Sequence, residues 1–228
     1  GPIKRSGQAD VVSLDDDWRF IRYGLQADGT RVDEPAGMFE PATDDSDWET
    51  LDVPHDFAIK GPFRMDLAGN TGRLPFQGIG WYRKTFIVDE ADQGKRFYVD
   101  FDGVMANAQV WLNGEYVGTW PYGYNSFRLD LTPFIQVGKE NLLAVRTDTE
   151  KWDSRWYPGA GIYRHVWLVK TGQVHVRHWG TKMEATNLTD KTADLHLTVE
   201  VENHMNEDAK AVVKTSVYEL DSLDCLGK

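Results

Sequence analysis

Short runs of alternating apolar and polar residues recur along this chain, separated by turn residues. The alternation is evident at Gly80–Phe86 and again at Phe97–Asp102. A period of two is typical of a β-strand that buries one face, and no stretch keeps the spacing of an amphipathic helix for long. We therefore expect both segments to be strands, and we expect them to be neighbours in one sheet.

Turn residues mark the connections between further strands. Asn113 and Gly114 separate two apolar runs, and this dipeptide is typical of a two-residue hairpin turn in which both residues have positive φ. Trp111, on the strand that leads into this turn, is expected to be buried. The segment Val11–Ile21 predicts a strand broken by an acidic turn. Other expected strands are Phe127–Leu129, Asn141–Arg146 and Ile162–Leu168, and many short strands at regular spacing predict a sandwich or jelly roll.

Two stretches differ from this pattern. Residues 23–50 are rich in Gly, Pro and Asp and predict a long surface excursion in which Trp48 turns back into the core. After Val176, Trp and Gly become rare, and apolar residues alternate strictly with polar ones from Ala193 to Glu202. This second pattern predicts the start of another β domain, of which about 50 residues are present where an immunoglobulin-like sandwich needs about 100.

The composition indicates a globular, acidic protein. Of the 228 residues, 41% are hydrophobic and 12% aromatic, which is enough apolar material for one full core. The formal net charge of −11 repels phosphate backbones, so no nucleic-acid partner is expected. We interpret the clusters Asp15–Asp17 and Asp44–Asp47 as solvated turn and loop residues, with a metal site as the alternative. No apolar run approaches the length of a membrane span, so no membrane partner is expected either.

The cysteine content and the first residues leave the compartment open. Cys225 is the only cysteine, so an internal disulfide is excluded, but this does not fix the compartment. Gly1-Pro2 is typical of a protease-cleavage scar, and residues 1–10 are expected to be a tag remnant or a flexible N-terminus. A signal peptide removed with that step would indicate a periplasmic or extracellular protein, and its absence a cytoplasmic one.

Common catalytic and cofactor motifs do not stand out. The chain contains no phosphate-binding loop and no Gly-x-Ser-x-Gly turn. The best zinc candidates are His175 and His178, with His196 nearby, but alternation puts His175 and His178 on opposite faces of a strand. We interpret them as ordinary surface or interface histidines, and we expect no metal and no cofactor.

The segment Asp153–Arg164 is unusually rich in Trp, Tyr, Arg and Gly. A loop of this composition could stack against sugar rings and hydrogen-bond their hydroxyls. Alternatively, Trp156 and Tyr157 fill the core while Arg155 and Arg164 pair with the acidic surface. Composition by itself leaves both interpretations open.

Six motifs in order give the chain a family resemblance. They are Asp44–Trp48, Val53–Asp56, Gly80–Lys84, Phe101–Val104, Val110–Gly114 and Ser154–Arg164, and together they cover residues 11 to about 172. In this order they resemble the sugar-binding N-terminal domain of family-two glycoside hydrolases, which include β-galactosidases, β-glucuronidases and β-mannosidases. Each motif is weak alone, but the ordered set is specific.

The resemblance implies an all-β fold. It consists of a jelly-roll (galactose-binding-like) β-sandwich over residues 11–172, followed by the beginning of an immunoglobulin-like β-sandwich over residues 173–228. A TIM barrel with two catalytic glutamates is expected beyond Lys228. Family members are retaining enzymes, whose two carboxyl groups lie about 5–5.5 Å apart. No catalytic residue is therefore expected in this chain.

The same resemblance implies that this domain lends loops to the rim of the barrel's active site. The matching positions are Asn70, Asp153, Arg155 and Trp156. An Asp at about Asp153 in β-galactosidases reaches the sugar hydroxyls or a bound cation, and an Asn near Asn70 faces the same pocket. Whether Asp153 or Arg155 reaches the sugar stays open at this stage.

We therefore expect the non-catalytic N-terminal part of a retaining β-glycosidase, inactive alone, whose partners are a β-galactoside and the catalytic barrel of the same polypeptide. Galactose is preferred over glucuronate because a glucuronate pocket needs cationic groups from residues outside this chain. The alternatives are an autonomous carbohydrate-binding module, a scaffold that only covers the barrel's flank, and part of a β-glucuronidase or β-mannosidase. Homo-oligomers of the full-length enzyme are left open.

Overall fold

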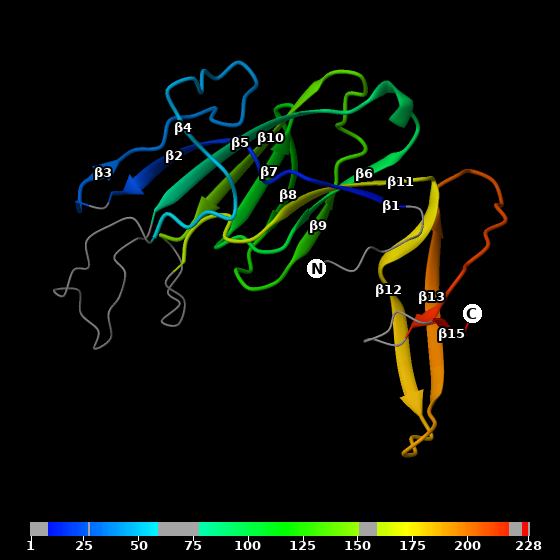
Figure 1. Cartoon of the computed structure of the whole chain (residues 1–228). Coiled ribbons are helices and arrows are strands. Elements are labelled where there is room, and N and C mark those ends of the chain that lie inside the picture. Colours follow the sequence, from blue (N-terminus) through cyan, green and yellow to red (C-terminus); the bar gives the residue numbers. More distant parts are fainter. Residues whose placement is uncertain (1–8, 27, 59–77, 151–158, 219–224, 228) are drawn as a thin grey trace. The chain divides into compact units, whose positions relative to one another are not determined.

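The structure is a computed structural model that describes residues 9–26, 28–58, 78–150, 159–218 and 225–227. Within it the chain forms two compact units, residues 1–171 and residues 172–228, and each is described by itself (Figure 1). The first unit contains two antiparallel sheets, and the second contains two separate strand pairs.

The first unit is a two-layer β-sandwich. Its four-stranded sheet has the order β1 (Ala9–Ser13), β11 (Val166–Thr171), β6 (Arg96–Phe101) and β9 (Phe127–Asp130). Its seven-stranded sheet has the order β3 (Arg31–Val32), β2 (Trp18–Leu25), β5 (Ile79–Ile87), β10 (Glu140–Asp148), β7 (Ala108–Leu112) and β8 (Glu115–Trp120), with β4 (Glu49–Leu51) paired to β2. A short 3-10 helix, η1 (Glu90–Asp92), follows β5.

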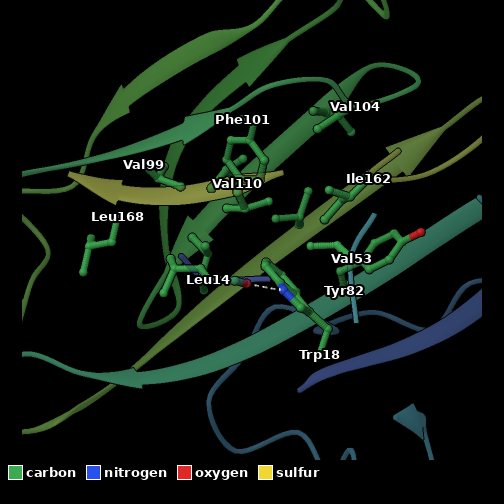
Figure 2. Packing of buried hydrophobic residues seen from close by; sticks show 14 of the residues in the cluster. Leu14, Trp18, Val53, Tyr82, Val99, Phe101, Val104, Val110, Ile162 and Leu168 are labelled. Atoms are coloured by element: carbon green, nitrogen blue, oxygen red, sulfur yellow. Dashed lines mark hydrogen bonds between the residues drawn. The ribbon is translucent and has the colours of Figure 1, made fainter. Parts of the chain in front are cut away.

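One large apolar cluster fills the space between the sheets, as Figure 2 shows. Trp18, Tyr82, Val99 and Phe101 are all completely buried in it. Even the Trp18 indole nitrogen is satisfied, since it donates to the Leu14 carbonyl at 2.6 Å. Burial on one face of each sheet matches the period-two pattern, and the predicted all-β jelly-roll sandwich is confirmed.

The prediction that Gly80–Phe86 and Phe97–Asp102 are sheet neighbours was wrong. Both segments are strands, but β5 lies in the seven-stranded sheet between β2 and β10, whereas β6 lies in the four-stranded sheet. The chain crosses from one layer to the other through Val88, which is buried, and η1. Two strands that each bury one apolar face can meet across a core as well as side by side, and alternation does not distinguish the two.

The predictions of turn positions made from turn residues are confirmed. β7 and β8 form the predicted hairpin, and Asn113 and Gly114 have φ values of 53° and 82°, as the two-residue turn requires. The acidic break in Val11–Ile21 separates β1 from β2, which lie in different sheets. Asp15 in this break is not simply solvated, because its carboxylate accepts from the Val166 N–H at 2.9 Å and contacts His165 Nδ1 at 2.7 Å.

The excursion over residues 33–48 is held to the outer face of the seven-stranded sheet by Arg83 of β5. This guanidinium is only 3% exposed and pairs with Asp45 at 2.8 Å. It also donates to the carbonyls of Met38, Glu40 and Thr43 at 2.9, 2.9 and 3.2 Å. Asp45 is therefore an anchor, although the sequence pattern indicated a solvated turn.

A second, smaller apolar cluster lies beneath this excursion. Trp48 is buried in it beside Trp81, so the predicted return of Trp48 into an apolar core is confirmed. Trp111 differs from its prediction, since it is only partly buried and packs against Phe39 with ring planes 8° apart. Its side chain points to the outer face of β7 instead of the central core, where its neighbours Val110 and Leu112 are buried.

The second unit is made of strand pairs. β12 (Val174–Thr186) and β13 (Asp194–Asn203) form a long antiparallel hairpin with an irregularity between Val176 and Thr181. β14 (Val217–Tyr218) pairs with β15 (Cys225–Gly227). Leu195, Leu197 and Val201 of β13 remain 47%, 43% and 41% exposed. In neither unit do the described residues form a helix long and apolar enough to cross a bilayer.

We predict that Arg83→Lys destabilises the chain by about 2–4 kcal/mol, because an ammonium cannot reproduce four hydrogen bonds from one buried planar fork. Urea denaturation of the 228-residue chain measures this, and amide exchange should accelerate over residues 33–48. Arg19→Lys is the matched control, since Arg19 donates to Thr50 Oγ1 at a partly exposed position of β2. Equal stability of the two variants would show that Arg83 does not hold the excursion.

Candidate functional site

The residues expected at the substrate rim, Asn70, Asp153, Arg155 and Trp156, lie outside the described residues. The chain is described again on both sides of each loop, at Ala58 and Gly78 and at Glu150 and Gly159. These four flanking positions show how the bases of the two loops are related. We refer to the residues that join them as the stem junction: residues 55–58, 78–80, 147–150 and 159–162.

One half of the stem junction joins the end of the first loop to the start of the second. The Thr149 N–H donates to the Gly78 carbonyl at 3.1 Å, and the Gly78 N–H donates to Thr149 Oγ1 at 3.1 Å. The Thr149 hydroxyl lies 3.2 Å from the Gly78 carbonyl as well. Thr149 is buried, so these bonds are shielded from water.

The other half joins the start of the first loop to the end of the second. The Phe57 N–H donates to the Ala160 carbonyl at 3.0 Å, and the His55 N–H donates to the Ile162 carbonyl at 2.7 Å. Asp56 adds a side-chain bridge, because its Oδ1 accepts from the Ala58 and Ala160 N–H groups at 2.8 and 3.0 Å. The described residues that flank the two segments are therefore hydrogen-bonded to one another in pairs.

Tyr82 of β5 lies directly beneath the stem junction. Its hydroxyl lies 2.7 Å from His55 Nδ1 within the core, near Val53 and Ile162 in Figure 2. Burial raises the pKa of the Tyr82 hydroxyl well above its usual value, so the group stays neutral and able to donate at physiological pH. Gly161, with a φ of 112°, packs against this hydroxyl so closely that a Cβ would collide with it.

Charged side chains surround residues 146–150, which lead into the second loop. Arg146 makes a bidentate pair with Glu34 at 2.7 and 2.8 Å and reaches Asp148 at 3.3 Å. Burial alone would raise the pKa of Glu34, but hydrogen bonds from Arg146 and Trp81 lower it overall. Glu150 pairs with Arg31 at 2.9 Å and accepts from the Leu25 N–H. These carboxylates act as supports for the stem, since each is already engaged by a cation or an N–H donor.

Two exposed tyrosines lie on the connection between β8 and β9. This connection is next to residues 161–163, which follow the second loop. Tyr122 and Tyr124 are 56% and 48% exposed. Gly123, between them, accepts a hydrogen bond from the Tyr163 hydroxyl at 2.6 Å, and this fixes the connection next to residues 161–163. Exposed aromatic faces of this kind can stack against sugar rings. The sequence analysis missed them, although their Tyr-Gly-Tyr pattern was visible.

The three histidines that the sequence suggested as zinc candidates have different surroundings in the structure. His178 packs against the neighbouring Trp179 ring, and His196 lies near Thr186 Oγ1 at 3.1 Å. His175 is buried and faces Glu202 and His204, which the sequence analysis did not consider. His204 is 29 residues distant, so only the pairing of β12 with β13 could reveal it.

The two packed antiparallel sheets place the first unit in the class of jelly-roll β-sandwiches, which includes lectin domains. Residues 11–172 match the family described as glycosyl hydrolases family 2, sugar binding domain, and the chain belongs to this family. The resemblance found in its motifs is thereby confirmed.

The relatives that this chain matches are named for two different activities. The chain is 44% identical over 209 residues to the β-galactosidase BoGH2A of Bacteroides ovatus, covering 90% of this chain and 23% of that protein. It is 46% identical over 136 residues to a putative β-glucuronidase of Formosa agariphila, covering 59% of this chain and 13% of that protein. The crystal structure of a β-glycosidase from Bacteroides vulgatus superimposes with a TM-score of 0.75 at 32% identity, covering 87% of this chain and 25% of that one. The chain thus spans about a quarter or less of the length of these relatives.

We predict that Gly161→Ala costs more stability than Gly94→Ala, because only the first combines a positive φ with a collision. Gly94 has a φ of 84°, but its Cβ would meet nothing within 4 Å. The difference should be about 1–3 kcal/mol in urea denaturation. Tyr82→Phe alone should cost about 1–3 kcal/mol by removing the buried hydroxyl.

Because Tyr82→Phe also removes the atom with which the new Cβ collides, the double variant should be more stable than the sum of the single effects predicts. Strict additivity would mean that Gly161 and the Tyr82 hydroxyl are not coupled and that the stem junction is not built on this contact.

Proposed function

We propose that this chain is the non-catalytic N-terminal part of a retaining β-galactosidase that hydrolyses terminal β-galactosides. In this proposal the two loops that leave the stem junction carry Asn70, Asp153, Arg155 and Trp156 to the rim of a substrate site, whose nucleophile and acid/base glutamates lie in a catalytic barrel of the same polypeptide. A retaining mechanism needs two carboxyl groups about 5–5.5 Å apart, and neither is assigned to this chain.

The observation that carries the proposal is the paired base of the loops. Backbone bonds join Gly78 to Thr149 and Phe57 to Ala160, so the residues that flank both loops are buried and hydrogen-bonded to one another. Substrate-positioning groups are effective only when held to within a fraction of an ångström, and a rigid base reduces the entropy lost on closing over a sugar. Two loops with a common base can act on one ligand.

The roles follow from the chemistry of the side chains. Asp153 would accept hydrogen bonds from sugar hydroxyls or hold a cation, Arg155 would donate to hydroxyls, and the Trp156 ring would stack on the apolar face of the sugar. Galactoside is preferred to glucuronide because a relative named as a β-galactosidase is 44% identical over 90% of this chain. A putative β-glucuronidase that is 46% identical covers only 59% of the chain, and a β-glucuronidase that covers 95% is only 27% identical. Residues 173–228 we assign to the beginning of an immunoglobulin-like domain that connects this sandwich to the barrel.

An autonomous carbohydrate-binding module is the second candidate. Exposed Tyr122 and Tyr124, fixed beside the stem junction, favour it because stacking platforms are what such modules use. On this view the sandwich would bind sugar without the barrel. The two candidates differ in what the isolated chain can do.

Alone, the 228-residue chain should hydrolyse no aryl β-galactoside above the uncatalysed rate, and titration with galactose or lactose should release no heat of saturable binding. The full-length enzyme should turn over aryl β-galactosides with a higher kcat/KM than aryl β-glucuronides. Turnover by the isolated chain would contradict the proposal. Saturable binding that Tyr122→Ala abolishes would support the module instead, and a preference for glucuronides would correct the sugar.

In the full-length enzyme, Asp153→Ala and Arg155→Ala should each be tested for kcat/KM and melting temperature. Loss of a hydrogen bond made in the transition state should lower kcat/KM by about tenfold to a hundredfold and leave the melting temperature nearly unchanged. Trp111→Ala is the contrasting variant, because it should lower the melting temperature through lost packing with Phe39 and preserve kcat/KM. Wild-type kcat/KM in both loop variants would make the domain purely structural.

A further inference from the structure

Three potential ligand groups gather at the open end of the β12–β13 hairpin. His175 and Glu202 are directly opposite each other in the strand register, and His204 follows Glu202 by two residues on the same side of the chain. A backbone bond from the His204 N–H to the Gln173 carbonyl, at 2.9 Å, extends the pairing beyond the last register pair. The backbone therefore fixes all three side chains on one face.

The ligand atoms lie close together. His175 Nε2 is 3.1 Å from His204 Nε2 and 3.7 Å from Glu202 Oε2, and His204 Nε2 is 3.3 Å from the same oxygen. Zinc bonds of about 2.0–2.2 Å in a tetrahedral site place two ligand atoms about 3.3–3.6 Å apart. The triangle of three atoms thus has nearly the size of one face of a zinc tetrahedron, before any adjustment of the side chains.

A hydrogen bond at the other nitrogen of His175 orients the ring so that Nε2 can bind a metal ion. Its Nδ1 lies 3.0 Å from the Val176 carbonyl, and a carbonyl can only accept, so Nδ1 carries the proton. In the neutral ring, Nε2 then carries the lone pair and points toward the other two groups. Metal-bound histidines almost always donate their second N–H to a carbonyl or carboxylate in this way. The His175 side chain is only 4% exposed, so its orientation is fixed by its surroundings.

Charges around the cluster are compatible with a dication. Arg177, on the same face of β12, pairs with Glu200 at 3.0 Å and approaches Glu202 Oε1 at 3.5 Å. The oxygen that faces the histidines is the other one, Oε2, so Glu202 can bind an ion without leaving Arg177. Glu200 and Glu202 together offset the charge of Arg177 and reduce its repulsion of a cation.

We propose that His175, Glu202 and His204 form a binding site for zinc or a similar borderline divalent transition-metal ion. Two imidazoles and one carboxylate are donors that such ions prefer, whereas magnesium and calcium prefer all-oxygen sites. The fourth position is left to water or another donor. Since the site joins β12 to the chain just after β13, a bound ion clamps the open end of the hairpin and opposes its fraying.

The test is calorimetric titration of the metal-free 228-residue chain with zinc chloride and, separately, with magnesium chloride. The chain should bind one zinc ion and give no saturable signal with magnesium. Glu202→Gln and His204→Ala should each weaken zinc binding by at least about tenfold, since each removes a direct ligand. Cobalt(II) should give visible absorption bands in the wild-type chain that both variants lose.

His196→Ala is the matched control, because this exposed histidine lies on the same strand, outside the cluster. It should bind zinc like the wild-type chain, and circular dichroism of all variants should remain that of a β protein. The proposal is overturned if the wild-type chain takes up no zinc saturably, if both ligand variants keep wild-type affinity, or if His196→Ala loses it. This outcome is independent of the role proposed for the loops.

Discussion

The hydrogen bond between the buried Tyr82 hydroxyl and His55 is the contact on which the stem junction depends. Tyr82 comes from a central strand, whereas His55 belongs to the segment that leads toward the first loop. A polar group at full burial must find a partner, because an unsatisfied one costs about 1–3 kcal/mol. The core therefore selects one position for residues 53–58, and Gly161 can approach only because it has no Cβ. The bases of both loops follow from this single arrangement.

In the proposed function, this arrangement is what lets a domain to which no catalytic carboxylate is assigned contribute to a substrate site. The sandwich supplies a rigid base, and the ion pairs of Glu34 with Arg146 and of Glu150 with Arg31 brace it from the side. Groups placed on such a base lose little entropy when they contact a substrate. Variation in the loops can then change the sugar without altering the core, which is consistent with a family whose members carry both β-galactosidase and β-glucuronidase names.

The second unit is limited by the stability of its long hairpin. Its long hairpin exposes Leu195, Leu197 and Val201, and a two-stranded ribbon is only marginally stable by itself. Any interaction that holds the two strands together at the open end stabilises such a hairpin. The proposed ion site lies there, where the ligands come from opposite strands and binding would oppose separation of the strands.

The sequence by itself determined the features that depend on neighbours along the chain. The Asn113-Gly114 turn needs only two positive φ values, and the period-two segments need only one buried face, so both were predicted correctly. The ordered motifs were sufficient for the family. The expectation that the loops carrying Asn70 and Asp153 reach a substrate stays a prediction. That those loops share a base was not contained in any local pattern.

Only the tertiary structure decided which distant residues meet. Alternation could not show that β5 and β6 lie in different sheets, because both arrangements bury the same side chains. The carbonyl partners of Arg83, the bonds from Gly78 to Thr149, and the approach of His204 to His175 join residues far apart in sequence. Such contacts are fixed by strand pairing and by the satisfaction of buried polar groups, and neither is encoded in a window of neighbouring residues.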